Sequence, residues 1–144
     1  MRANSVSFMK DEHTCLLCLG SNFEGIYHLK KAETALNRLL PDIYWGEIIE
    51  TKAEGETIGL DPYQNRLALL HTSLGIDDLK ELFKQIEKEN GRTKESKKNG
   101  VIPLDIDLLT YDNHILKPKD LEKEYMKQLS ARFLPFPPLQ VKKQ

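Results

Sequence analysis

The sequence predicts an α+β fold of the ferredoxin-like type, a split βαβ arrangement with an antiparallel sheet and helices on one face. Three observations predict it: short apolar runs typical of strands, two amphipathic stretches of helical period between them, and the order β-α-β-β-α-β along the chain. The 144 residues suit one domain. We expect a single domain over residues 1–144, in which residues 1–12 form a flexible arm.

The first half of the chain begins with a strand over Thr14–Leu19, which is apolar enough to be central. Gly20-Ser21-Asn22 interrupts it, and the side chain of Ser21 or Asn22 can cap a following helix. From Phe23 to Leu39 apolar and small residues recur at spacings of three and four, which predicts an amphipathic helix that Pro41 ends.

The second and third strands follow this helix. Ile43–Thr51 is rich in isoleucine and aromatic residues, and Tyr63–Thr72 places Tyr63, Asn65 and Leu67 in one phase of a strand. Between them, residues 52–62 carry glycines, a proline and several acids, which predicts a loop long enough to be functional.

The second half repeats the pattern of a helix followed by a strand. Ile76–Asn90 has a helical apolar stripe, and Gly91 ends it. Arg92–Gly100 reads as a polar, basic loop, and Ile102–Tyr111 as the fourth strand. Asp120–Leu129 is expected to form a final helix.

Composition excludes several classes of protein. Hydrophobic residues make up 40% and charged residues 30%, and 21 basic against 22 acidic residues leave a net charge of −1. This balance does not favour a nucleic-acid partner, and no apolar run is long enough to span a membrane. We expect a cytoplasmic monomer that binds small molecules. Cys15 and Cys18 lie on one predicted strand, where residues three apart face opposite sides, so we expect two packed, reduced thiols.

The strongest chemical signal is the Asp105-Ile106-Asp107 run on the fourth strand. Both carboxylates leave the same face, about 7 Å apart, and repel each other unless a cation lies between them. Mg²⁺ takes one or two protein carboxylates and completes its shell with phosphate oxygens and water. The run is therefore a sensible seat for Mg-ATP, although a strand with one solvated face gives the same pattern.

Two further groups are candidates for binding. A basic loop before the carboxylates contains Arg92, Lys94 and Lys98, which can bind a polyphosphate. The alternative is a solvated loop in which these charges have no binding role. Tyr63 and Asn65 share one strand face, where an amide can read the edge of a pyrimidinone-like ring and an aromatic can pack on it. By itself, that pair is equally consistent with an ordinary strand end.

Together these residues resemble the 6-hydroxymethyl-7,8-dihydropterin pyrophosphokinase family, over most of the chain from Cys18 to about Pro137. The resemblance is carried, in order, by Gly20-Ser21-Asn22, Tyr63-Gln64-Asn65, Glu87 with Gly91-Arg92, Leu104-Asp105-Ile106-Asp107-Leu108, and Phe133 before Pro135. Each motif is short, but their common order and spacing make the match specific.

The resemblance implies transfer of the terminal pyrophosphate of ATP to the hydroxymethyl group of a dihydropterin, leaving AMP, in folate biosynthesis. Asp105 and Asp107 would hold two Mg²⁺ ions, and Arg92 would contact phosphate from a loop that closes over the site. Glu87, with Lys94 and Lys98, would lie at the ATP. Asn65 would read the polar edge of the pterin, while Tyr63 and Phe133 would sandwich its ring.

Several positions of the phosphate-binding loop depart from the family pattern, and Ile102 is the one that bears most directly on activity. The family carries a second arginine three residues before the first aspartate, and that position is Ile102 here. Three functions therefore stay open: an active pyrophosphokinase, a divergent pterin- or nucleotide-binding relative with slow or different activity, and a non-catalytic ferredoxin-like binding module. An RNA-binding module would carry aromatic residues on its central strands, whereas Ile102–Leu109 carries two aspartates and no aromatic.

Overall fold

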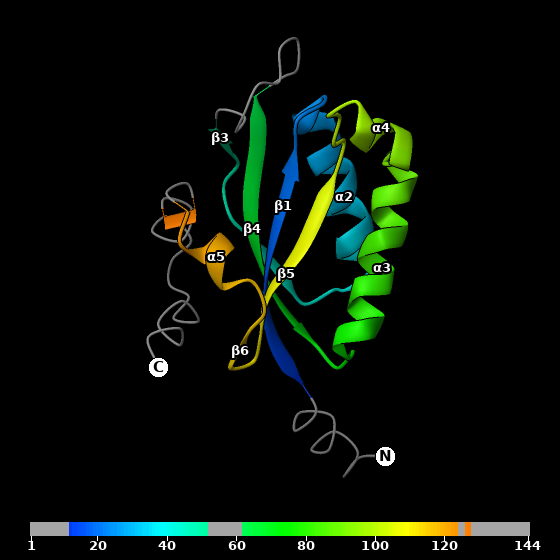
Figure 1. Cartoon of the computed structure of the whole chain (residues 1–144). Coiled ribbons are helices and arrows are strands. Elements are labelled where there is room, and N and C mark those ends of the chain that lie inside the picture. The colour runs from blue at the N-terminus through cyan, green and yellow to red at the C-terminus, as the bar shows by residue number, and fades with distance from the viewer. Residues whose placement is uncertain (1–11, 52–61, 124–125, 128–144) are drawn as a thin grey trace.

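A computed structural model describes residues 12–51, 62–123 and 126–127 of the chain (Figure 1). Its elements are β1 (His13–Ser21), α2 (Gly25–Leu39), β2 (Ile43–Trp45), β3 (Ile49–Thr51), β4 (Tyr63–Thr72), α3 (Ile76–Glu89), α4 (Lys94–Lys98), β5 (Asp105–Tyr111), β6 (His114–Ile115) and α5 (Pro118–Leu121).

The strands form one antiparallel sheet in the order β2-β4-β1-β5-β6, and β3 also pairs with β4. The three central strands, β4, β1 and β5, lie in the order expected for a split βαβ unit, with β1 between the two strands that come later in the chain. The predicted ferredoxin-like α+β fold is confirmed.

The two long helices, α2 and α3, cover one face of this sheet (Figure 1). Their apolar stripes meet alternate residues of the central strands, because successive strand residues point to opposite faces. The largest core side chains on this face are fully or almost fully buried: Leu17, Leu19, Leu70 and Leu108 from the sheet, and Leu29, Leu36, Leu79, Phe83 and Ile86 from the helices. This layer makes the sheet a rigid support for its other face.

The opposite face of the sheet is divided into an apolar and a polar part. Leu121 of α5 and Met126 pack on Leu16, Leu67 and Leu109 in a second buried cluster. Figure 1 shows α5 on the side of the sheet away from α2 and α3. The short α5 is therefore an addition to the predicted arrangement, whose two long helices do share one face. Beyond this cluster the same face carries polar residues.

Two predicted segments differ in detail from the structure. The strand expected over residues 43–51 is divided into β2 and β3, which both pair with β4. The basic loop expected over residues 92–100 contains α4, whose start is fixed by a capping box. In that box the Ser96 amide donates to Thr93 Oγ1 at 2.9 Å and the Thr93 amide donates to Ser96 Oγ at 2.9 Å.

Asn22 has a different role from the predicted helix cap. The N-cap of α2 is Glu24, in the left-handed region with φ 48°, and no side chain caps it. The Asn22 amide instead holds the segment before β5, because its Nδ2 donates to the Gly100 carbonyl at 2.8 Å and its Oδ1 accepts from the Ile102 amide at 2.7 Å. Asn22 therefore ties the end of β1 to the approach of β5.

A β-bulge interrupts β5 beyond its two aspartates. Leu17 pairs with Leu108, but Leu16 pairs with Thr110, so Leu109 is an extra residue on β5. The Leu109 carbonyl accepts hydrogen bonds from the amides of Leu116 at 2.8 Å and Lys117 at 3.3 Å. These two hydrogen bonds hold the segment that follows β6 against the bulge.

Several expectations lie outside the described residues. These are the arm over residues 1–11, most of the loop over residues 52–62, much of the helix expected over residues 120–129, and Phe133. Within the described ranges, none of the helices combines the length and apolar character that crossing a bilayer requires.

Replacing Asn22 by alanine should destabilise the fold by about 1–3 kcal/mol, because the partly buried amide of Ile102 and carbonyl of Gly100 lose their side-chain partner. The Asn22 side chain is 2% exposed, so solvent cannot easily replace it. Urea unfolding measures the loss. The matched control is Asn113→Ala in the exposed turn before β6, which should change stability far less; equal losses in both variants would contradict the role of Asn22.

Candidate active site

The register of the three central strands places the predicted site residues in two adjacent rows. Gly20 of β1 pairs with Asn65 of β4 on one side and Asp105 of β5 on the other. Two residues further along, Cys18 pairs with Leu67 and Asp107. Asn65, Asp105 and Asp107 therefore meet on one face, which is the face that α2 and α3 leave uncovered.

A first cavity of about 320 Å³ lies on this face, and we call it the sheet cavity. It is lined by Cys18, Gly20, Thr51, Tyr63, Asn65, Asp105, Asp107, Leu109, Asp120, Lys123 and Met126. Polar groups stand at the end of the central strands, and the apolar side chains come from the cluster under α5. A flat ring with one polar edge and one apolar edge suits such a lining.

Asn65 is held in a fixed orientation within the sheet cavity. It is 5% exposed, and its Nδ2 donates to Thr51 Oγ1 at 3.0 Å. A Cβ at Gly20 would stand 3.0 Å from Asn65 Oδ1, closer than most side chains allow, so the glycine leaves room for the amide. Asn65 therefore presents its oxygen as an acceptor while its nitrogen is engaged by Thr51.

A second cavity of about 330 Å³ lies between α3 and β5, and we call it the helix-strand cavity. Its apolar lining residues are Phe83, Ile106, Leu108 and Leu116, and its charged ones are Lys80, Lys84, Glu87, Arg92, Asp105, Asp107 and Lys117. An apolar wall beside several cations suits a ligand that has a flat base and an anionic tail.

The two cavities share two lining residues, Asp105 and Asp107. A ligand in either cavity thus reaches the same pair of carboxylates. Two molecules bound in the two cavities would therefore meet at one point, which is the geometry that transfer of a group between them needs.

The carboxylate pair is electrostatically strained in the absence of a cation. Burial and the neighbouring Asp105 carboxylate raise the pKa of Asp107 to about 7, and Lys117 opposes the shift only in part. Two oxygen ligands that repel each other, with open cavity on both sides, fit a hard divalent ion that completes its shell with phosphate and water. The described residues contain no group of three or more side chains that could hold a metal ion.

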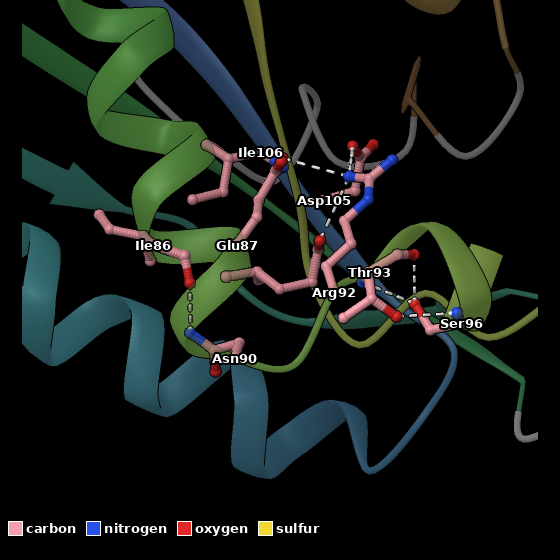
Figure 2. Close-up of polar contacts among 9 residues, drawn as sticks. Ile86, Glu87, Asn90, Arg92, Thr93, Ser96, Asp105 and Ile106 are labelled. Carbon is pink, nitrogen blue, oxygen red and sulfur yellow. Dashed lines mark hydrogen bonds and ion pairs between the residues drawn. The ribbon is translucent and has the colours of Figure 1, made fainter.

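Arg92 is placed beside this pair by the end of α3. Gly91, with φ 93°, ends the helix in a Schellman motif, in which the Gly91 amide donates to the Lys88 carbonyl at 3.0 Å and the Arg92 amide to the Glu87 carbonyl at 3.1 Å. Figure 2 shows Arg92 between Glu87 and Asp105. Its Nη1 donates to Asp105 Oδ1 at 2.6 Å and lies 3.2 Å from Glu87 Oε2.

Glu87 is fixed from a second side. The Ile106 amide donates to its Oε2 at 2.8 Å, and the side chain is 14% exposed. Burial raises the pKa of the Glu87 carboxyl, while the Ile106 amide and Arg92 pull that pKa downward. The contacts of Arg92 with Glu87 and Asp105 therefore link the end of α3 to the start of β5. They hold the arginine beside Asp105, one of the two carboxylates that line both cavities.

Comparison with known proteins agrees with this geometry. Residues 16–137 match the family described as 7,8-dihydro-6-hydroxymethylpterin-pyrophosphokinase. The chain belongs to this family. It is also 32% identical over 136 residues to a folate synthesis bifunctional protein of Chlamydia trachomatis serovar D, and the match covers 83% of this chain and 30% of that protein. The chain thus spans about a third of the length of that relative.

Most of the residues predicted for the site of this pyrophosphokinase family member converge in the structure. Tyr63 and Asn65 line the sheet cavity, Glu87 and Arg92 line the helix-strand cavity, and the two aspartates line both. Lys94 and Lys98 are exposed on α4 and line neither cavity, so their binding role stays a prediction. Phe133 lies outside the described residues.

Sequence reasoning missed several lining residues. Thr51, Lys80, Lys84 and Lys117 were not singled out. Lys80 and Lys84 do lie one helical turn apart on α3, on the same side as Glu87, and that spacing was a usable signal. Thr51 and Lys117 are brought in by strand pairing and by the bulge, which leave no local pattern in the sequence.

The pKa of Asp107 predicts how stability depends on pH. It is about 7 in the fold, against an ordinary value of 3.8, so the folded state holds this proton more tightly than the unfolded state. Its stabilising contribution is full below about pH 4 and is lost as the pH rises through 7. Asp107→Asn should remove that fall and stabilise the protein above pH 7, on the order of 1 kcal/mol after solvent screening, in urea unfolding between pH 4 and 8.

The matched variant is Asp105→Asn, which keeps Asp107 and removes its charged neighbour. The pKa of Asp107, followed by carboxyl NMR, should then move down toward its ordinary value. A pKa that stays near 7 in this variant would contradict the coupling between the two carboxylates.

Proposed function

We propose that this protein transfers the terminal pyrophosphate of ATP to the hydroxymethyl group of 6-hydroxymethyl-7,8-dihydropterin, with AMP as the second product, in folate biosynthesis. The observation that carries the proposal is that two cavities of different chemical character share Asp105 and Asp107. Membership of the pyrophosphokinase family supports the same reaction.

The sheet cavity is the proposed pterin site. The Asn65 oxygen, with its amide nitrogen held by Thr51, suits the N–H groups along the polar edge of a pterin. Tyr63 offers a ring to pack against the heterocycle, and Phe133 is proposed to contact its other side. Cys18 is buried and its thiol pKa is strongly raised, so it serves as an apolar wall and not as a nucleophile.

The helix-strand cavity is the proposed ATP site. Phe83 and Leu116 are among the apolar residues that would pack on the base, and Arg92, with Lys80 and Lys84 of α3, would face the phosphates. Glu87 is proposed to orient Arg92, with which it forms an ion pair. Lys94 and Lys98 are proposed as outer contacts, because α4 directly follows Arg92 in the chain.

Magnesium dependence follows from the same carboxylates. Asp105 and Asp107 would hold Mg²⁺, with two ions proposed, and bound Mg²⁺ supplies charge neutralisation and orientation of the phosphate oxygens. Arg92 already donates to Asp105, so the site carries a cation of its own on the α3 side. With a nucleotide present, Arg92 would donate to phosphate oxygen in place of part of this contact.

The reaction requires little covalent work from the protein. The hydroxymethyl oxygen forms a bond to the β-phosphorus, the bond from that phosphorus to the bridging oxygen of the α-phosphate breaks, and AMP leaves with the bridging oxygen while the hydroxyl proton is released. The residues of the chain contribute by holding the two substrates in line and by placing Arg92 where negative charge builds up.

The direct test is AMP release from ATP and Mg²⁺ with and without the dihydropterin. We expect pterin-dependent AMP in the wild type and loss of at least about 100-fold in Asp105→Asn and Asp107→Asn, because each variant removes one carboxylate ligand. Pterin binding measured by calorimetry should survive in both. Tight pterin binding without AMP in the wild type would favour a divergent binding relative, and binding of neither substrate would favour a non-catalytic module.

The pterin site has its own prediction. Thr51→Val should weaken pterin binding about 10-fold, because Asn65 loses the hydroxyl that orients its amide. Asn65→Ala should weaken it at least as much, while the affinity for ATP should stay unchanged in both variants. Calorimetric titration with each ligand measures the split, and a parallel loss of ATP binding would contradict separate sites.

A further inference from the structure

Lys117 is a positively charged residue that lines the helix-strand cavity with Asp105 and Asp107. The proposed mechanism above gives it no role. It follows β6, and its amide and that of Leu116 both donate to the Leu109 carbonyl at the bulge. This short return brings Lys117 into the lining of the helix-strand cavity together with Asp105 and Asp107. Its position is therefore set by the backbone of β5 itself.

The side chain of Lys117 is available for a ligand. It is exposed and makes no hydrogen bond or ion pair with another residue in the described part of the chain. Arg92, by contrast, is held by Asp105, Glu87 and the Leu104 carbonyl. The positive charge of Lys117 does act on Asp107, whose pKa it lowers in part, which agrees with its place beside the pair.

A nucleotide triphosphate in this cavity needs such a cation. Its phosphates carry several negative charges and must approach two carboxylates that repel them. Arg92 comes from the end of α3, whereas Lys117 comes from the β6 side, so the two cations belong to different elements around the same carboxylates. The lysines of α4 line neither cavity and cannot fill this place in the described conformation.

We propose that Lys117, delivered by the β5–β6 hairpin, is a positioning residue that holds the polyphosphate of ATP against Asp105 and Asp107. The inference rests on the proposed function and adds a specific phosphate contact to it. It also gives this chain a cation near the shared carboxylates that does not depend on position 102, where an isoleucine stands.

The test compares Lys117→Met with Lys117→Arg, and with Lys119→Met, a change of a nearby exposed lysine on α5, as the matched control. Calorimetry with Mg²⁺ and an α,β-methylene analogue of ATP should show binding about 10- to 100-fold weaker in Lys117→Met, since one charge-assisted contact is lost. Lys117→Arg should bind within a few-fold of the wild type, and the control should be unchanged. In turnover, the KM for ATP should rise far more than kcat falls.

Binding of AMP separates a phosphate contact from a general change in the cavity. AMP affinity should be the same in Lys117→Met and the wild type, because the lysine faces the polyphosphate and not the base. Equal weakening of AMP and the triphosphate analogue would overturn the inference, as would unchanged triphosphate binding in Lys117→Met or failure of arginine to replace lysine.

The outcomes also distinguish this inference from the proposed function. A wild type that makes pterin-dependent AMP, with a Lys117→Met variant of unchanged KM, would overturn the role of Lys117 and leave the pyrophosphokinase standing. A wild type that binds neither nucleotide nor pterin would overturn both. Thermal unfolding of each variant should match the wild type, because the substituted side chain is exposed.

Discussion

Two like charges fixed two residues apart on one strand are the constraint around which this protein is arranged. Burial and the neighbouring Asp105 carboxylate together raise the pKa of Asp107 to about 7. Around the pair lie an arginine from the end of α3, a lysine from beyond β6, and two open cavities. In the proposed function, this repulsion would favour binding of a cation together with a polyanionic substrate.

The support behind the pair is built from backbone contacts that span the chain. The register of β4, β1 and β5 fixes which side chains share a row, and the layer of α2 and α3 keeps that register rigid. Asn22 holds the approach to β5, and the Schellman motif at Gly91 holds Arg92. The Schellman motif is local, but the strand register and the Asn22 bonds join residues that are distant in sequence, so the site depends on the complete fold.

The sequence alone predicted the features that depend on local hydrophobic periodicity and on short motifs. The same-face placement of Asp105 and Asp107 follows from strand alternation, and the order of elements follows from apolar spacing. It could not find the function of Asn22, since Ser21-Asn22 before a helix looks like a cap and only the tertiary pairing with Gly100 and Ile102 shows otherwise. It did not single out Lys80, Lys84 and Lys117, which line the helix-strand cavity, whereas Lys94 and Lys98 of α4 line neither cavity. Hydrogen bonds between distant segments carry no local signature, and these decided the differences.

The bulge at Leu109 makes the length of β5 as important as its composition. Side chains along a strand point to alternate faces of the sheet, and the extra residue at Leu109 shifts this alternation by one. Each residue after the bulge therefore faces the side opposite to the one it would face without it. Deleting one residue at the bulge would keep both aspartates and every lysine. It would nevertheless turn Leu116, Lys117 and the start of α5 toward the opposite face of the sheet. In this stretch a substitution should therefore disturb the structure less than an insertion or a deletion, because the number of residues between Asp107 and Lys117 sets where Lys117 lies.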